Sequence, residues 1–170
     1  VHDPRLVWNT LDIVDQYQGI TVQSKSGHAF IKDVMREHNA VYGGEMSAHH
    51  YFRDFAYCDS GMIPWLLAIS VLSETQQSLS SLVEDMITKF PCSGEINFKV
   101  ADTQATIQKL FDHFADQNPE IDRTDGVSLD FGTWRFNVRA SNTEPLLRLN
   151  IESRLDQNPK PMQAYVNELT

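Results

Sequence analysis

Apolar residues in the first half of the chain recur at helical spacing in two segments, each followed by a short candidate strand. Residues 11–17 predict a helix that begins after a cap at Asn9 or Thr10, and residues 20–23 predict a strand. The next predicted helix has an apolar face made of Phe30, Ile31, Val34 and Met35. With a further strand at residues 40–42, this alternation predicts an α/β domain with a parallel or mixed sheet and covering helices.

The pattern changes after the last of these strands. Residues 45–61 predict a loop, and residues 62–72 are apolar nearly all round, which predicts a buried helix. Residues 79–87 predict an amphipathic helix. We expect it to end near Phe90, because the residue before a proline is steered away from helical geometry. A domain boundary is therefore predicted at residues 90–94.

Strands outnumber helices in the second half of the chain. Strands are predicted at residues 95–100, 127–129, 134–138 and 146–151, and helices at residues 103–114 and 161–169. The last strand alternates apolar with polar residues, which is typical of a half-buried strand. The sequence therefore predicts the α/β domain over residues 1–90 and a smaller α+β domain over residues 91–170.

The composition is that of a globular protein with a negative charge. Of 170 residues, 41% are hydrophobic and 22% are charged, and the formal net charge is −9. Nucleic acids and anionic membranes repel such a chain, so we expect neither as a partner. No apolar run reaches the roughly 18 residues that span a bilayer, and no signal peptide is visible, so we expect a cytoplasmic protein. Cys58 and Cys92 lack framework spacing, and we expect two free thiols.

The first candidate site is the loop G-G-E-M-S-A-H-H at residues 43–50, which follows a predicted strand. Ligands of open α/β sheets gather at the carboxyl ends of the strands. The two glycines allow a tight turn that brings Glu45 and Ser47 to one side of the loop. A carboxylate accepts hydrogen bonds from vicinal hydroxyls, and a serine both donates and accepts, which suits a sugar. An ordinary polar loop with a solvated glutamate is an alternative interpretation.

The second candidate site is R-A-S-N-T-E-P at residues 139–145, between two predicted strands. Arg139 can hold a phosphate bidentately, and Ser141 and Thr143 offer hydroxyl groups. Asn142 tolerates left-handed geometry, and successive N–H groups of such a turn can form an anion-binding nest. These residues predict a phosphate site, with an ordinary turn as the alternative.

A third loop, S-K-S-G-H at residues 24–28, lies between a predicted strand and the start of a helix. The helix N-terminus, with Lys25 and His28 beside it, suits an anion. A solvated loop with a capping serine explains the same residues.

All three loops resemble motifs of the α-D-phosphohexomutase family and occur in the order found there. Residues 44–49 resemble its sugar-binding G-E-M-S-G-H loop, residues 139–143 its phosphate-binding R-x-S-N-T loop, and residues 25–28 its K-T-G-H segment. Residues 43–65 are similar to the phosphomannomutases of bacterial GDP-mannose and surface-polysaccharide pathways. Ala48 departs from the usual glycine, and alanine adopts a positive φ less readily.

The resemblance implies a role for each half of the chain. Residues 1–90 would be the family's third domain, which binds the sugar, and residues 91–170 its fourth, which holds the phosphate that does not react. The implied sugar-site residues are Glu45, Ser47, Lys25 and His28. The implied phosphate-site residues are Arg139, Ser141, Asn142 and Thr143.

Two motifs of the family do not occur in this sequence. One is the T-A-S-H-N-P loop, whose serine carries the transferable phosphate, and the other is the magnesium-binding D-G-D-G-D-R loop. The resemblance therefore implies that this chain needs the N-terminal domains of a longer chain, with Mg²⁺ bound there. The implied reaction interconverts mannose 6-phosphate and mannose 1-phosphate through a bisphosphorylated intermediate. We expect no catalytic residue, no metal ligand and no turnover from this chain alone.

Three other functions stay open. The protein could act on glucose as well as mannose phosphates; Met46 favours these substrates over glucosamine phosphate, for which a serine is usual there. A non-catalytic module that binds sugar phosphates is a second alternative. A metal-dependent hydrolase that uses Glu45, His49 and Asp54 is a third, although the H-E-x-x-H pattern is absent.

Overall fold

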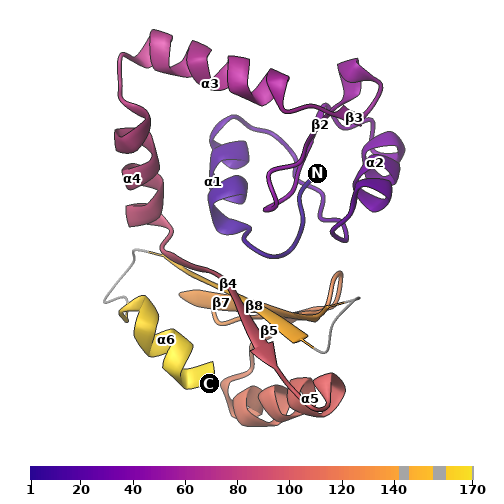
Figure 1. Ribbon diagram of the computed structural model, residues 1–170. Coiled ribbons are helices and arrows are strands. Elements are labelled where there is room, and N and C mark those ends of the chain that lie inside the picture. The colour runs from indigo at the N-terminus through magenta and orange to yellow at the C-terminus, as the bar shows by residue number, and fades with distance from the viewer. Residues whose placement is uncertain (142–145, 155–159, 170) are drawn as a thin grey trace. The chain divides into compact units, whose positions relative to one another are not determined.

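The computed structural model describes residues 1–141, 146–154 and 160–169. The chain folds as two compact units, Val1–Thr88 and Lys89–Thr170 (Figure 1). Within the described ranges, no helix is both long and apolar enough to cross a membrane. Cys58 and Cys92 are free and exposed.

The first unit has a small sheet with helices around it (Figure 1). Its elements are α1 (Trp8–Gln16), α2 (His28–Glu37), β1 (Tyr42–Gly44), β2 (His50–Phe52), η1 (Arg53–Phe55), β3 (Cys58–Asp59), α3 (Met62–Thr75) and α4 (Leu79–Lys89). Strands β1, β2 and β3 pair in that order and antiparallel. Parallel bridges join His2 to Gln23 and to Gly44, so the arrangement is mixed, as the alternating pattern predicts.

Helix α2 packs on β1 because the strand has no side chain at the point of contact. Ile31 and Met35 are fully buried on the inner face of α2, together with Tyr51 of β2. A Cβ atom at Gly43 would lie 2.7 Å from the Met35 sulfur and 2.8 Å from a methyl group of Ile31. Gly43 is therefore required by the packing of α2, whereas the turn that follows does not use it, since Gly43 lies within β1 and its φ is not positive.

The structure corrects four details of the first half. The strand predicted over residues 20–23 does not form, and only Gln23 makes a bridge, to His2. Helix α1 begins at Trp8 with no side-chain cap, because its N-cap residue is Val7, whose side chain has no hydrogen-bond acceptor. Phe30, expected on the buried face of α2, is 51% exposed. The predicted loop over residues 45–61 contains β2, η1 and β3, which are too short to show a period in the sequence.

The prediction that residues 62–72 form a buried helix is right about the helix and wrong about burial. None of the residues of α3 is buried, and Trp65 and Leu66 are 55% and 56% exposed. The apolar side chains of this helix show that it would favour burial. Burial also needs a partner surface, and the sequence does not specify one. Helix α4 ends at Lys89, just before Phe90 and Pro91, as expected.

The second unit is a five-stranded antiparallel sheet with two helices and a 3-10 turn. Its elements are β4 (Cys92–Lys99), α5 (Thr103–Phe114), η2 (Ala115–Gln117), β5 (Glu120–Asp122), β6 (Val127–Asp130), β7 (Trp134–Ala140), β8 (Leu146–Ser153) and α6 (Met162–Leu169). The strand order is β4-β8-β7-β6-β5. Together the two units confirm the predicted fold class, an α/β domain followed by an α+β domain.

Apolar and polar residues alternate along the strands, so one face of this sheet is apolar and the other is polar. On the apolar face, side chains such as Phe136, Leu149 and Ile151 form one buried core with Ile107 and Phe114 of α5. On the other face, the register of β7 and β8 pairs three sets of polar residues. These pairs are Arg135 with Glu152, Asn137 with Asn150, and Arg139 with Arg148. The polar face thus leads to the predicted phosphate loop at the end of β7.

Candidate functional site

The first candidate loop makes a tight turn between β1 and β2. The N–H of Glu45 donates to the carbonyl of His49 at 3.0 Å, and the N–H of Ala48 donates to the carbonyl of Glu45 at 2.9 Å. Ala48 adopts a φ of 63°, in the left-handed region. This conformation costs alanine about 1 kcal/mol more than glycine, which explains why a glycine is the usual residue at the matching position of the resembling motif.

The carboxylate of Glu45 joins the first loop to the third. Its Oε1 accepts a hydrogen bond from the backbone N–H of Gly27 at 2.7 Å, and its Oε2 accepts one from the Tyr51 hydroxyl at 2.6 Å. The Glu45 side chain is 5% exposed. The loops at residues 24–28 and 43–50, which the sequence presents as separate candidates, therefore meet at one buried carboxylate.

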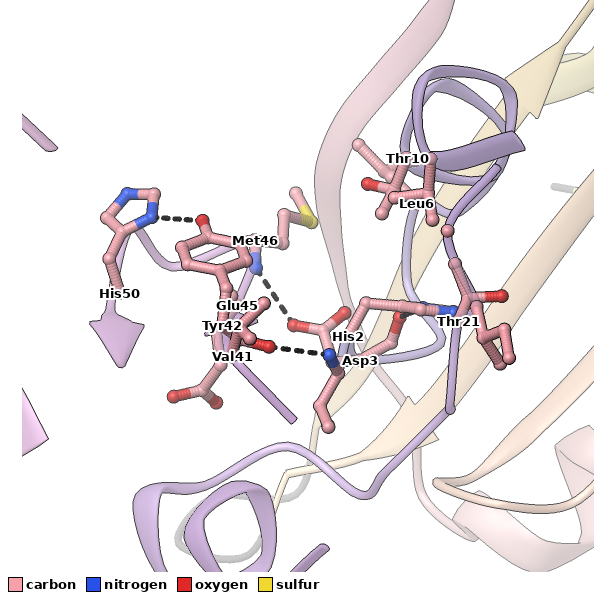
Figure 2. Close-up of a pocket in the computed structure, with 15 residues that line it drawn as sticks. His2, Asp3, Leu6, Thr10, Thr21, Val41, Tyr42, Glu45, Met46 and His50 are labelled. Atoms are coloured by element: carbon pink, nitrogen blue, oxygen red, sulfur yellow. Dashed lines mark hydrogen bonds between the residues drawn. The ribbon is translucent and has the colours of Figure 1, made fainter. Parts of the chain in front are cut away.

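A second buried carboxylate holds the loop from its other side. Asp3 is ion-paired with Arg5, and both are buried. The Oδ2 atom of Asp3 also accepts the backbone N–H of Met46 at 2.9 Å (Figure 2). Sequence reasoning missed Asp3 as a positioning residue. The available signal was a pair of opposite charges two residues apart in the segment that precedes the first helix.

Two cavities flank the first loop. One has a volume of about 450 Å³ and is lined mainly by apolar side chains such as Leu6, Val41 and Met46 (Figure 2). The other has a volume of about 490 Å³ and a polar lining. Its lining residues are Gly27, His28, Lys32, Glu45, Ser47, His49, Tyr51 and Asp59. The polar cavity therefore brings together three of the four residues predicted for a sugar site: His28, Glu45 and Ser47.

Lys25 is the predicted sugar-site residue that does not line this cavity. Its ammonium group lies instead 5.8 Å from the ring centroid of Phe30, which is exposed on α2. Lys32 lines the cavity instead and was not predicted. Its position on the polar face of α2 gave no indication that a loop 13 residues further on would face it.

Burial sets the protonation states next to the loop. Burial raises the pKa of Tyr51 far above its ordinary value, and the hydrogen bond to the Glu45 carboxylate raises it further. The hydroxyl of Tyr51 is therefore a lasting donor to Glu45. Burial, and then the neighbouring His49, lower the pKa of His50, whose Nδ1 lies 2.6 Å from the Tyr42 hydroxyl (Figure 2). Neutral His50 can accept that hydroxyl proton.

Substitution of Tyr51 by phenylalanine is expected to lower the free energy of unfolding of the first unit by about 1.5–3 kcal/mol at pH 7. The change leaves one oxygen of a buried carboxylate without its donor. The folded-state pKa of Tyr51 lies above the ordinary tyrosine value of 10.0, so the wild type loses stability as the pH rises above 10, and the phenylalanine variant lacks this loss. Urea denaturation at pH 7 and pH 10.5 measures both effects.

The matched control for this substitution is Tyr17→Phe, because Tyr17 is 84% exposed. This variant should have nearly the stability of the wild type. If Tyr51→Phe were equally neutral at pH 7, the hydrogen bond to Glu45 would not hold the loop.

The second candidate site begins at Arg139, near the end of β7. Arg139 pairs in register with Arg148 of β8, and both face the carboxylate of Glu95 on β4. The guanidinium–carboxylate distances are 3.7 Å from Arg139 Nη2 and 3.5 Å from Arg148 Nη1. Sequence reasoning missed Arg148. The alternation of residues 146–151 predicts that it lies on the polar face, but only the pairing register places it beside Arg139.

Each arginine has one buried donor, its Nε atom. Among the residues that the structure describes, neither the Nε of Arg139 nor that of Arg148 has an acceptor. The backbone N–H of Ser141 donates to the carbonyl of Leu146 at 2.8 Å, which closes the turn after β7. Two adjacent guanidinium groups with unused donors suit an anion with several oxygens. Asn142 and Thr143 lie outside the described residues, and their predicted roles stay predictions.

The hydrolase alternative requires Glu45, His49 and Asp54 to meet. His49 Nδ1 is 3.7 Å from Glu45, but the side chain of Asp54 is 92% exposed. Among the residues that the structure describes, no three His, Cys, Asp or Glu side chains are grouped so that they could hold a metal ion.

Two family models match the chain, one for each unit. Residues 1–90 match "Phosphoglucomutase/phosphomannomutase, alpha/beta/alpha domain III", and residues 95–161 match "Phosphoglucomutase/phosphomannomutase, C-terminal domain". The chain belongs to the phosphoglucomutase/phosphomannomutase family. The family that the sequence analysis predicts is thereby confirmed.

Curated relatives agree with this family. The chain is 65% identical over 156 residues to "Phosphohexose mutases" of Xanthomonas campestris pv. campestris (strain B100), which is 92% of this chain and 35% of that protein. It is 58% identical to a phosphomannomutase of Salmonella typhimurium, over 92% of this chain and 34% of that protein. A phosphomannomutase of Vibrio cholerae is 56% identical over 100% of this chain and 36% of its own length. The chain thus spans about a third of the length of these relatives.

A solved structure shows the same fold. A phosphoglucomutase/phosphomannomutase family protein from Burkholderia thailandensis matches 99% of this chain and 36% of its own, with a TM-score of 0.71 and 22% identity.

Proposed function

We propose that this chain is the sugar- and phosphate-binding part of a phosphomannomutase that interconverts mannose 6-phosphate and mannose 1-phosphate through a bisphosphorylated intermediate. The observation that carries the proposal is the polar cavity around Glu45 in the first unit. The arginine pair of the second unit supports it separately. The names of the relatives that cover this chain supply the substrate class.

Glu45 retains capacity to bind a sugar although both of its oxygens are already bonded. A carboxylate has about four acceptor positions, and Gly27 and Tyr51 use one on each oxygen. The remaining positions can accept two neighbouring hydroxyl groups of a sugar. Ser47 is exposed beside them, and its hydroxyl lies 3.0 Å from His49 Nδ1. A mutase has to bind its substrate in two orientations. The fixed carboxylate would accept hydrogen bonds from a pair of vicinal hydroxyl groups in each of them.

The arginine pair would hold the phosphate that does not react. A guanidinium group matches phosphate oxygens with two parallel N–H donors, and two such groups lie side by side at Arg139 and Arg148. The turn that starts at Ser141 follows directly. Asn142 and Thr143 are proposed to complete this grip.

The reacting phosphoryl group would be served by other domains of the enzyme. Mg²⁺, when bound, neutralises charge that develops on a transferring phosphoryl group. The described residues of this chain do not offer the cluster of carboxylate oxygens that Mg²⁺ prefers. We propose that the N-terminal domains supply the metal and the phosphoserine, in a cytoplasmic enzyme that serves GDP-mannose and polysaccharide synthesis.

This chain alone should show no mutase turnover in a coupled assay.

An enzyme of dual specificity is the second candidate. The relative named "Phosphohexose mutases" favours it, because that name covers more than one hexose. Comparison of mannose 6-phosphate with glucose 6-phosphate distinguishes the two candidates, since a mannose enzyme should bind the former more tightly.

Calorimetric titration of the chain tests the proposal. We expect mannose 6-phosphate to bind about tenfold or more tightly than either mannose or inorganic phosphate, because only the phosphosugar offers both groups. Equal binding of mannose and mannose 6-phosphate would contradict the phosphate role, and equal binding of phosphate and mannose 6-phosphate would contradict the sugar role. Turnover that is equal in the wild type and in Arg139→Ala would indicate a contaminant and not this chain.

A further inference from the structure

One carboxylate lies against both arginines of the phosphate site. Glu95 of β4 presents Oε1 to Arg148 at 3.5 Å and Oε2 to Arg139 at 3.7 Å. Charge-assisted hydrogen bonds between nitrogen and oxygen are typically about 2.7–2.9 Å long. Glu95 therefore reduces the charge of the pair without forming close hydrogen bonds to it, and its side chain is 25% exposed.

Several donors near Glu95 are left without an acceptor. Among the described residues, none accepts a hydrogen bond from the buried Nε atom of either arginine. Asn150, which pairs in register with Glu95, is fully buried, and no residue in the described part of the chain bonds to its amide nitrogen or amide oxygen. Unsatisfied buried donors are costly, so this face is better suited to an anion with more oxygens than a carboxylate.

The two arginines cannot neutralise the charge of Glu95 and the charge of a phosphate at the same time. Two arginines and one glutamate leave a net charge of about +1 at the site in the free protein. A phosphate monoester carries about −1.5 to −2 near neutral pH. The arginine pair alone balances that charge, whereas the pair together with Glu95 leaves an excess of negative charge.

We infer that Glu95 is an internal substitute for the phosphate: it occupies Arg139 and Arg148 in the free protein and is displaced when the phosphate binds. Glu95 then lowers the affinity of the site and favours release of the bound phosphosugar. This inference rests on the proposed function, because it assumes that the arginine pair binds the phosphate.

The test is Glu95→Gln, titrated with inorganic phosphate and with mannose 6-phosphate. Glutamine keeps the size of the side chain and removes its charge. We expect both ligands to bind about five- to tenfold more tightly, as follows from removing one like charge within a few ångströms of the phosphate near the surface. The control is Glu120→Gln, which makes the same charge change at an exposed residue on the edge strand β5 and should leave binding unchanged.

Two further variants make the outcome decisive. Glu95→Asp keeps the charge but shortens the reach of the carboxylate, so it should bind both ligands with affinities between the wild type and Glu95→Gln. Unchanged or weaker binding by Glu95→Gln, with binding by the wild type still lost in Arg139→Ala, overturns the role of Glu95 and leaves the proposed function standing. Binding by the wild type that does not depend on Arg139 overturns both.

Discussion

Substitution of Arg139 by alanine is expected to raise the dissociation constant for mannose 6-phosphate by about 10- to 100-fold. Hydrogen bonds to charged groups contribute about 1.5–3 kcal/mol, and each 1.4 kcal/mol is a tenfold change in affinity. Arg139 is predicted to make two such bonds to the phosphate. Its neighbour Arg148 can compensate only in part, because it reaches the site from the next strand.

Two comparison variants separate the effect of the guanidinium geometry of Arg139 from the effect of its positive charge. Arg139→Lys keeps the charge but loses the planar pair of donors, so we expect an affinity between those of the wild type and Arg139→Ala. Lys109→Ala removes one positive charge from an exposed position on α5 and should leave affinity unchanged. Calorimetry at constant ionic strength measures all four proteins. An Arg139→Ala variant that binds mannose 6-phosphate as tightly as the wild type would contradict the phosphate role of the loop.

Substitution of Phe114 by alanine is expected to lower the free energy of unfolding of the second unit by about 3–5 kcal/mol. Phe114 ends α5 and is fully buried. Its ring centroid lies 5.3 Å, 5.8 Å and 5.6 Å from the ring centroids of Phe131, Trp134 and Phe136. The smaller side chain leaves a cavity between helix and sheet that these rigid rings cannot fill.

Urea denaturation followed by circular dichroism measures this loss. The control is Phe55→Ala, because Phe55 is 51% exposed on η1, and its removal should cost less than about 1 kcal/mol. Since the chain has two compact units, the transition of each unit is compared separately with the wild type. Equal losses for the two variants would contradict the assignment of Phe114 to the core of the second unit.

The best-predicted elements are long enough for their apolar pattern to repeat several times, and a local sequence signal such as a capping residue marks where they begin. Helix α5 has the predicted bounds, because Asp102 caps it by accepting the N–H of Ala105 and its apolar residues recur at helical spacing. Strands β2, β3 and β5 have two or three residues each, and no period can be seen over so short a length. The exposure of α3 also lay beyond the sequence, because burial depends on a partner surface.

The candidate site follows the same rule: residues within a local sequence motif were predicted, and their partners from distant parts of the chain were not. The motifs predicted Glu45, Ser47 and Arg139, because those residues stand in loops with a recognisable local pattern. The residues that hold them come from elsewhere in the chain. Tyr51 reaches Glu45 across the turn, and Glu95 reaches Arg139 from another strand. Such partners depend on register and packing, which one sequence does not specify.

The most direct test of the central claim is a titration of isotopically labelled protein with mannose 6-phosphate, followed through backbone amide shifts. We expect shifts at Gly27 and Ser47 in the first unit and at Ser141 in the second, with those at Ser141 lost in Arg139→Ala. Shifts at neither loop up to millimolar ligand would contradict the claim that this chain binds the sugar and the phosphate.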